Sequence, residues 1–275
     1  MYQLAGWGGE YECPIICAGD IFDKWDAPAE LVNHAITWLP HMFVVPGQHD
    51  LPNHSDNEFH RSALCTLELA ERVTVVENWV DAEPGLLIYG AGWNQEIKEL
   101  PVVKSRRTIN ILAAHRYVWR GAAKHTKACD EDNFNHLCKT CDGYDAVVFG
   151  DNHMQWSGRV RDTIYWNNGS MMRRTRDQRN HQPHAGLLSW DSVKGNKGKM
   201  EIRPLQFDIG KDQIAEHVEE APEGEPLDFK EFLEDLGQSM ASSGDLFETG
   251  IKEFIRRNKL DDKVKGIITR LMKDS

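Results

Sequence analysis

Short apolar runs alternate with longer amphipathic stretches along the first two hundred residues. Residues 14–18 are apolar at every position and end in Gly19-Asp20, which predicts a strand buried on both faces that stops at a loop. Residues 28–39 have apolar positions spaced for one face of a helix, and residues 42–45 predict a second buried strand. Strands alternating with helices in this way predict an α/β layered domain.

Further runs of β-branched and apolar residues predict more strands in the same domain. They lie at 73–76, 86–89, 109–113, 146–149, 163–166 and 186–190. After Asp212 the pattern changes to an acidic stretch with Pro and Gly, which is typical of a linker. We therefore expect one domain over 1–211, an acidic linker over 212–226 and a helical tail over 227–275.

Composition indicates a protein that folds in a reducing compartment. The chain has 275 residues, of which 40% are hydrophobic, and a chain of this length buries roughly 70–75% of its unfolded surface without needing disulfides. The N-terminus lacks the pattern of a secretory signal, and no apolar run approaches the ~20 residues that cross a bilayer. We expect a cytoplasmic protein that does not enter a membrane and whose six cysteines are free thiols or ligands.

Charge is unevenly distributed along the chain. The net charge is -11, but residues 104–179 hold 14 Lys and Arg against 8 Asp and Glu, a local balance of +6. The rest of the chain therefore carries -17. Two interpretations stay open: these basic residues form a face that attracts phosphates, or they are ordinary solvated surface.

Four predicted strand ends carry side chains that can bind metals. The segments are Gly19-Asp20-Ile21-Phe22-Asp23, Gly47-Gln48-His49-Asp50, Ala113-Ala114-His115 and Gly150-Asp151-Asn152-His153. Ligands bind at the carboxyl ends of strands in α/β sheets, and these oxygen and nitrogen donors suit manganese, iron or zinc. The preceding glycines are expected to let the backbone approach a bound phosphate. Each segment alone is typical of a turn or a surface histidine, but the four together predict one shared site.

The order G-D-I-F-D, G-Q-H-D, A-H, G-D-N-H resembles the calcineurin-like metallophosphoesterase superfamily, whose pattern is D-x-H, G-D-x-x-D, G-N-H-D/E, a lone H and G-H-x-H. The resemblance covers roughly residues 14–190. The segments at 19–23 and 167–174 (N-N-G-S-M-M-R-R) most resemble SbcD-type DNA repair exonucleases and their phage relatives. The resemblance implies two packed mixed β-sheets flanked by helices in a four-layer sandwich, here without its first strand and helix.

Carried over position by position, the resemblance implies a two-metal centre. Asp20 would bridge two divalent ions, Mn²⁺ in the favoured case and Mg²⁺, Fe²⁺ or Zn²⁺ in the others. Gln48, His115 and Asp151 would complete one site, and His153 would belong to the other. Two cations about 3.5–4 Å apart activate a water and neutralise charge on a phosphate during in-line attack.

The remaining expected roles concern the substrate. His49 would lie beside the phosphate, where it protonates the leaving oxygen or stabilises transition-state charge, and Asp50 would orient its imidazole. The expected substrate-binding residues are His54, Arg116, Arg173 and Arg174.

Three departures qualify the resemblance. Gln48 stands where the family has Asn, and Asp151 replaces a histidine, which hardens that site towards manganese or magnesium. More seriously, no D-x-H precedes Gly19, so the second metal site keeps only Asp20 and His153. The absent strand would also leave residues 15–18 without a neighbour on one side. We favour an incomplete N-terminus over a naturally shortened protein. A naturally shortened protein would be expected to bind one metal and to show weak or no hydrolysis.

Other residues have two interpretations each. Cys138-x-x-Cys141, with Cys129, His125 and His136 nearby, has the spacing of a zinc knuckle, but a helix over 135–141 with Cys141 packed inward is favoured. The histidines that lie near the motifs as surface or site residues are His60, His181 and His184. The aromatic residues expected to stack on bases or to line the core are Trp25, Tyr117, Trp119 and Trp156.

These observations favour a metal-dependent hydrolase of DNA phosphodiesters, which would act as an exonuclease or endonuclease in recombination, repair or replication. One origin considered is a phage gene, in which case the protein would act in the host cytoplasm. One alternative is a phosphomonoesterase or small-molecule phosphodiesterase. Another is a non-catalytic binding subunit with a depleted metal site. By analogy, the tail at 227–275 is expected to engage an ATPase partner subunit, and a homodimer is the other arrangement considered.

Overall fold

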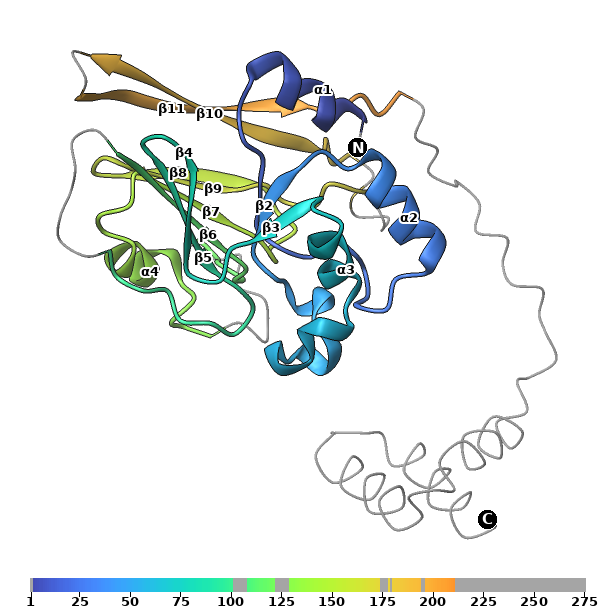
Figure 1. Ribbon diagram of the computed structural model, residues 1–275. Helices are drawn as coiled ribbons and strands as arrows, with labels where there is room; N and C mark the ends of the chain where they lie inside the picture. The colour runs from blue at the N-terminus through green and yellow to red at the C-terminus, as the bar shows by residue number, and fades with distance from the viewer. Residues whose placement is uncertain are drawn as a thin grey trace, which may run out of the picture. The chain divides into compact units, whose positions relative to one another are not determined.

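The computed structural model describes residues 2–100, 108–121, 129–173, 178, 180–193 and 196–210. Their strands form a six-stranded sheet, a three-stranded sheet and a two-stranded hairpin (Figure 1). The predicted linker at 212–226 and helical tail at 227–275 lie outside the described residues.

The smaller sheet is parallel, with the order β1-β2-β3. Its strands are β1 (Ile16–Cys17), β2 (Met42–Val44) and β3 (Val73–Val75). Two helices, α2 (Ala29–Trp38) and α3 (Ala63–Leu69), pack on one face of it through a shared apolar core. β1 is shorter than predicted and only half-buried, because it lies at the edge of the sheet and pairs with β2 alone among the described strands.

The larger sheet is mixed and has the order β4-β5-β6-β7-β9-β8. Its strands are β4 (Trp79–Glu83), β5 (Leu86–Ala91), β6 (Ile109–Ala114), β7 (Ala146–Phe149), β8 (Trp156–Val160) and β9 (Thr163–Asn167). The four inner strands are parallel, and the two edge strands are antiparallel to their neighbours. All six residues of β6 are buried, which explains why its sequence is almost continuously apolar.

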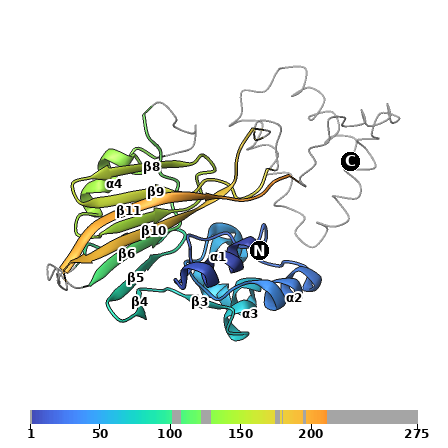
Figure 2. The ribbon, with the colours of Figure 1, turned by 90° about the horizontal axis from the view of Figure 1, so that it is seen from above.

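The two sheets pack face to face. Ile16 and Phe43 of the smaller sheet contact the apolar cluster that contains Ile88 and Ala113 of the larger one. On its other face the larger sheet packs against α4 (Phe134–Thr140). Figure 2 shows α4 on the opposite side of the sheets from α2 and α3. The layers therefore run helix, sheet, sheet, helix, and the predicted fold class is confirmed; within the described residues only the larger of these two sheets is mixed.

A long hairpin and an N-terminal helix complete the described part of the chain. β10 (His184–Val193) pairs with β11 (Asn196–Gln206), and α1 (Tyr2–Tyr11) packs beside the end of this hairpin, where the Trp7 and Phe207 rings lie 4.8 Å apart between centroids. Neither α1 nor β11 is predicted from the sequence. Short 3₁₀ helices connect β2 to α3, at Gln48–Asp50, Pro52–His54 and Asp56–Arg61. None of the helices in the described ranges is long and apolar enough to cross a membrane.

Candidate metal centre

The fold brings the four predicted strand ends to one place. Because β1 pairs in parallel with β2, and β6 with β7, each pair of strands ends at the same edge of its sheet. The His115 ring connects the two sheets, since its Nδ1 lies 2.6 Å from the backbone oxygen of Ala18. Gly150 N–H donates to Ala114 O at 3.0 Å and holds the end of β7 beside that of β6.

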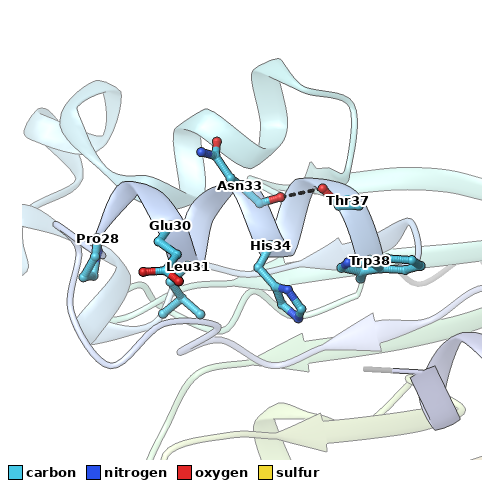
Figure 3. A pocket seen from close by; sticks show the side chains of 7 residues that line it. All are labelled: Pro28, Glu30, Leu31, Asn33, His34, Thr37 and Trp38. Atoms are coloured by element: carbon cyan, nitrogen blue, oxygen red, sulfur yellow. Dashed lines mark hydrogen bonds between the residues drawn. The ribbon is translucent and has the colours of Figure 1, made fainter.

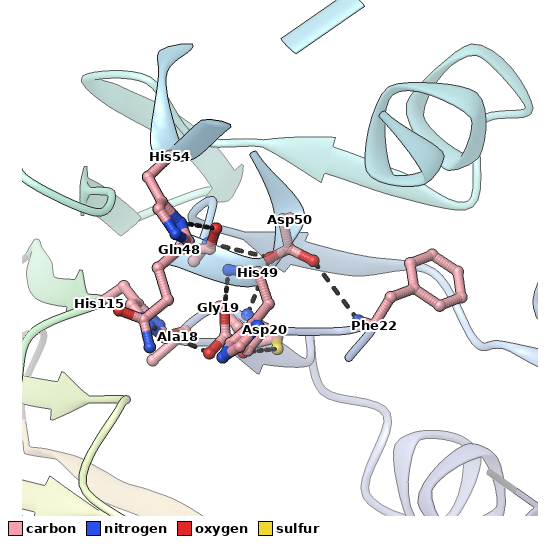
Figure 4. Close-up of polar contacts among 11 residues, drawn as sticks. Ala18, Gly19, Asp20, Phe22, Gln48, His49, Asp50, His54 and His115 are labelled. Carbon is pink, nitrogen blue, oxygen red and sulfur yellow. Dashed lines mark hydrogen bonds and ion pairs between the residues drawn. The ribbon is translucent and has the colours of Figure 1, made fainter. Parts of the chain in front are cut away.

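Asp20 and His115 form the centre of this junction (Figure 4). The His115 side chain is 1% exposed, and its Nδ1–H donates to Ala18 O, which leaves the lone pair on Nε2. Nε2 is buried and makes no hydrogen bond, while Oδ2 of Asp20 lies 3.4 Å from it. Imidazoles that bind metals are oriented by this kind of hydrogen bond from the other ring nitrogen. The pair therefore fits a cation shared between Nε2 and the carboxylate.

Electrostatics favour the carboxylate form of Asp20. Burial by itself would raise the pKa of Asp20, but the contact with His115 and the backbone N–H of His49 outweigh it, so the pKa is lowered. Burial by itself would lower the pKa of His115, but the Asp20 carboxylate outweighs it, so that pKa is raised. A carboxylate that stays ionised is the form that binds a cation.

Asp50 holds the two neighbouring loops together. Its buried carboxylate accepts hydrogen bonds from the backbone N–H groups of Gly47 at 2.9 Å, Asp20 at 2.8 Å and Phe22 at 3.4 Å. Burial raises the pKa of Asp50 to about 6. These three hydrogen bonds satisfy backbone donors where the two loops meet. The role of Asp50 in orienting the His49 imidazole stays a prediction.

His49, Gln48 and His54 surround the Asp20 carboxylate. His49 N–H donates to Asp20 Oδ1 at 2.9 Å, and its ring is exposed. The His54 Nδ1 lies 2.9 Å from the backbone oxygen of Gln48. Figure 4 shows the Gln48 side chain extending towards His115. The structure therefore brings these three predicted residues to the same junction as Asp20.

Asp151 and His153 lie at the margin of the junction. Burial raises the pKa of Asp151, and the charges of His115, Asp20, His153 and His49 also act on it, so these groups are neighbours. However, within the described ranges no three or more His, Cys, Asp and Glu side chains are grouped to hold a metal. The centre thus consists of one close ligand pair, Asp20 and His115, with the other predicted ligands around it.

The two strand-end aspartates share an uncommon backbone conformation. The φ angle is 55° at Asp20 and 69° at Asp151, in the left-handed region that few residues other than glycine adopt. Such a conformation costs on the order of 1–3 kcal/mol and is found mainly at functional sites. Both aspartates follow a glycine just after a strand, so the same local backbone arrangement presents both carboxylates.

Two of the glycines that precede predicted ligands allow the neighbouring side chains to pack closely against the backbone. A Cβ on Gly19, whose φ is +98°, would lie 2.3 Å from His115 Nδ1, and a Cβ on Gly47 would lie 2.0 Å from Asp20 Oδ1. The missing side chains therefore make room for the ligands themselves. The expectation that these glycines also let the backbone approach a phosphate stays a prediction.

Two of the described basic residues of the 104–179 segment are held in ion pairs. Arg116 is bound to Asp132, with 2.5 Å between Nε and Oδ1, and Arg161 pairs with Asp142 at 2.7 Å. Arg173 is half-buried, and Arg174 lies outside the described residues. The predicted role of Arg116 in binding substrate therefore competes with an existing ion pair.

Two residues at the junction were not predicted from the sequence. The Trp93 ring lies 6.2 Å from the His115 ring between centroids and stands edge-on to it. Asn167 is fully buried and donates from Nδ2 to the backbone oxygens of Asn152 at 2.7 Å and Met154 at 2.8 Å. Trp93 follows β5 and Asn167 ends β9, so both occupy strand ends. Trp is not a metal-binding residue type, and the Asn167 carboxamide donates to the backbone of the neighbouring loop.

Two of the other candidates, Cys141 and Trp156, pack in or against the core. The helix over 135–141 is confirmed as α4, with Cys141 fully buried, and burial raises the pKa of Cys141 to about 12. Trp156 packs against Phe134 in the core. The side chains that line a shallow hollow on α2 (Figure 3) include none of the predicted ligands: they are Pro28, Glu30, Leu31, Asn33, His34, Thr37 and Trp38.

No protein-family model matches the chain, and no curated protein matches it in sequence. Three solved structures are similar in shape. The sulfate thiohydrolase SoxB of Thermus thermophilus is 12% identical, with 74% of this chain and 42% of that one covered and a TM-score of 0.44. The protein TT1561, also of Thermus thermophilus, is 14% identical, with 61% and 82% covered and a TM-score of 0.41. Vps29 of Entamoeba histolytica is 17% identical, with 70% and 99% covered and a TM-score of 0.29. Because every TM-score is below 0.5, the functional argument rests on this chain's own residues.

Proposed function

We propose that this protein is a metal-dependent phosphoesterase that hydrolyses phosphodiester bonds in DNA. The observation that carries the proposal is the buried His115 Nε2, which has no hydrogen bond and faces the Asp20 carboxylate at 3.4 Å. This pair lies where four strand ends meet, and its motifs resemble those of calcineurin-like metallophosphoesterases. An imidazole nitrogen and an ionised carboxylate at this spacing form a binding place for a divalent cation.

The donor set suits Mn²⁺, with Mg²⁺, Fe²⁺ and Zn²⁺ as alternatives. Asp20, His115 and the Gln48 carboxamide would hold one cation, and Asp151 and His153 are the candidates to complete the centre. When bound, divalent cations activate a water molecule and neutralise the charge of a phosphate under attack. Asp50 fixes the loops that carry Asp20 and Gln48, through the three backbone N–H groups described above.

His49 is the candidate for proton transfer to the leaving oxygen. Its backbone is fixed by the bond to Asp20 Oδ1, while its ring remains exposed beside that carboxylate. An exposed imidazole next to the cation-binding place can reach a phosphate oxygen there, and imidazole is the side chain most used for proton transfer at neutral pH.

The choice of DNA as substrate is supported by the two segments that resemble SbcD-type exonucleases, residues 19–23 and 167–174. With that resemblance come further proposals: action in recombination, repair or replication, and an ATPase partner engaged through residues 227–275. A homodimer is the alternative to that partner, and a cytoplasmic location remains the expectation from the N-terminal sequence.

A second candidate function is a non-catalytic binding subunit. It is favoured by one observation, that the described residues contain no group of three or more His, Cys, Asp and Glu side chains arranged around a metal. A centre with two firm ligands binds a cation more weakly than a complete one, and hydrolysis would then be weak or absent.

Hydrolysis assays separate these functions. The purified chain would be incubated with Mn²⁺ and labelled single-stranded or duplex DNA, and in parallel with p-nitrophenyl phosphate. We expect DNA cleavage that EDTA abolishes. Cleavage of the monoester alone would favour a phosphomonoesterase, while no cleavage together with one or no bound metal per chain would favour the binding subunit.

A further inference from the structure

Three methionines are exposed on two loops beside the candidate metal centre. Met154 is 65% exposed, Met171 49% and Met172 59%. Nine large hydrophobic side chains are exposed in the described part of the chain, and these three occupy only two of its loops. Single exposed apolar residues are ordinary, but a group of them marks an interaction site. We define these three residues as the methionine rim.

The two loops of the methionine rim are joined to each other. Ser170 N–H donates to the backbone oxygen of His153 at 3.1 Å, which connects the loop after β9 to the loop after β7. Gly169 is packed so closely that a Cβ there would lie 2.9 Å from the same His153 oxygen. The rim is therefore continuous with the loop that carries Asp151 and His153.

The backbone of the methionine rim is ordered by side-chain hydrogen bonds. Asn167 Nδ2 donates to Met154 O at 2.8 Å, and Met154 N–H donates to Asn152 Oδ1 at 2.9 Å. Ser170 Oγ donates to Met172 O at 2.6 Å. Apolar side chains that a fixed backbone keeps in water forgo the favourable free energy of burial. Their exposure is therefore consistent with a ligand that covers them.

We propose that the methionine rim is a subsite for an unpaired nucleobase next to the phosphate at Asp20 and His115. This inference rests on the proposed function and names the part of the substrate that is recognised. Methionine is flexible and polarizable, so its thioether adapts to the flat face of an aromatic ring. The exposed neighbour Gln155 is polar, and its carboxamide can meet the hydrogen-bonding edge of a base. A purely aliphatic ligand would leave that carboxamide without a partner.

Oxidation footprinting tests the subsite directly. The full-length protein would be treated briefly with hydrogen peroxide, which converts exposed methionine to its sulfoxide, and each peptide measured by mass spectrometry. The reaction is run with Ca²⁺ in place of Mn²⁺, alone, with single-stranded oligothymidine, and with an abasic oligonucleotide of the same length. The Leu69→Met variant supplies a reference thioether at a position on α3 that is 82% exposed in the wild-type protein.

We expect oligothymidine to slow oxidation of Met154, Met171 and Met172 by about two- to tenfold, the range given by methionine–aromatic contact energies. The abasic strand and the reference at position 69 should show no protection. Protection of the rim by both strands alike would overturn the inference, because phosphates alone would then account for it. The absence of protection by either strand would also overturn it.

Activity measurements keep this inference separate from the proposed function. In a Met154→Gln, Met171→Gln, Met172→Gln variant, KM for single-stranded DNA should rise about two- to tenfold relative to wild type, with Leu69→Gln as the matched exposed control. If wild type cleaves DNA and this variant has the same KM, the subsite is wrong and the hydrolase remains. If wild type cleaves no phosphodiester, the proposed function fails, and the footprint still decides whether bases bind the rim.

Discussion

The two halves of the candidate centre differ in how completely the protein chain builds them. At the ends of β1 and β6, Asp20 and His115 lie 3.4 Å apart, the ring is fixed by Ala18, and the carboxylate is fixed by the backbone N–H of His49. At the end of β7, Asp151 and His153 lie on a loop that is braced by Asn167, and they join no group of three ligands among the described residues. The comparison shows that the first half is fixed by close contacts before any cation binds, so under the proposed function it is the preorganised half and the second half is the less complete one.

The largest effect is expected from Asp20→Asn. The substitution removes the charge of the preorganised half and keeps its shape, so hydrolysis of bis-(p-nitrophenyl) phosphate with Mn²⁺ should fall by about 100-fold or more. Asp26→Asn, at an exposed position six residues further along, is the matched control and should retain full activity. A comparable loss of hydrolysis in both variants would contradict the proposed role of Asp20 as a metal ligand.

A second prediction concerns the packing of the first half. A methyl group at position 47 would lie 2.0 Å from Asp20 Oδ1. Gly47→Ala should therefore displace the carboxylate and weaken Mn²⁺ binding in calorimetry by about 10- to 100-fold, as changes around metal ligands do. Gly6→Ala is the control, because a Cβ there meets nothing within 4 Å. Equal Mn²⁺ affinity in the two variants would contradict the tight packing of this loop.

The brace of the second half can be removed separately. Asn167→Ala leaves the buried oxygen of Asn152 and the part-buried oxygen of Met154 without their donor, which should lower the free energy of unfolding by about 1–3 kcal/mol in urea titrations. Asn57→Ala, at an exposed position, should change it little. An Asn167→Ala protein as stable as wild type would mean that the loop of Asp151 and His153 does not depend on this brace.

The smallest effect is expected at His54. Its backbone is left-handed, with φ 56°, and asparagine tolerates that conformation, so His54→Asn removes the hydrogen bond to Gln48 O with little strain. The Mn²⁺ concentration that gives half-maximal activity should rise by about two- to tenfold, the equivalent of one hydrogen bond. His60→Asn is the exposed control. If the two variants behave alike, His54 has no positioning role.

The same comparison shows which features the sequence could predict. Strands buried on both faces, such as β6 and β7, are apolar at nearly every position, so their existence is confirmed, while the ligand roles of the residues at their ends stay predictions. Strands with one solvated face, such as β8, carry alternating polar residues and were missed. The polar β11 and the glycine-bearing α1 show no clear periodic spacing of apolar residues. Their positions depend on contacts with distant parts of the chain, such as the contact between Trp7 and Phe207.

Site residues were predictable by type, but their detailed roles were not. Asp20 and His115 followed from the strand-end pattern, and they lie together. The use of Asp50 for backbone N–H groups and the pairing of Arg116 with Asp132 depend on burial and on partners distant in sequence. Asn167 could not be singled out from the sequence, because its role depends on hydrogen bonds to two backbone oxygens whose positions only the structure shows.

Anomalous diffraction from crystals soaked in MnCl₂ would examine the preorganised half most directly. A manganese peak within bonding distance of both the Asp20 carboxylate and His115 Nε2, about 2.0–2.2 Å from each, is the result that we expect. A map with no peak between these two side chains, while manganese occupies other carboxylates of the same molecule, would contradict the claim that they form a cation-binding centre.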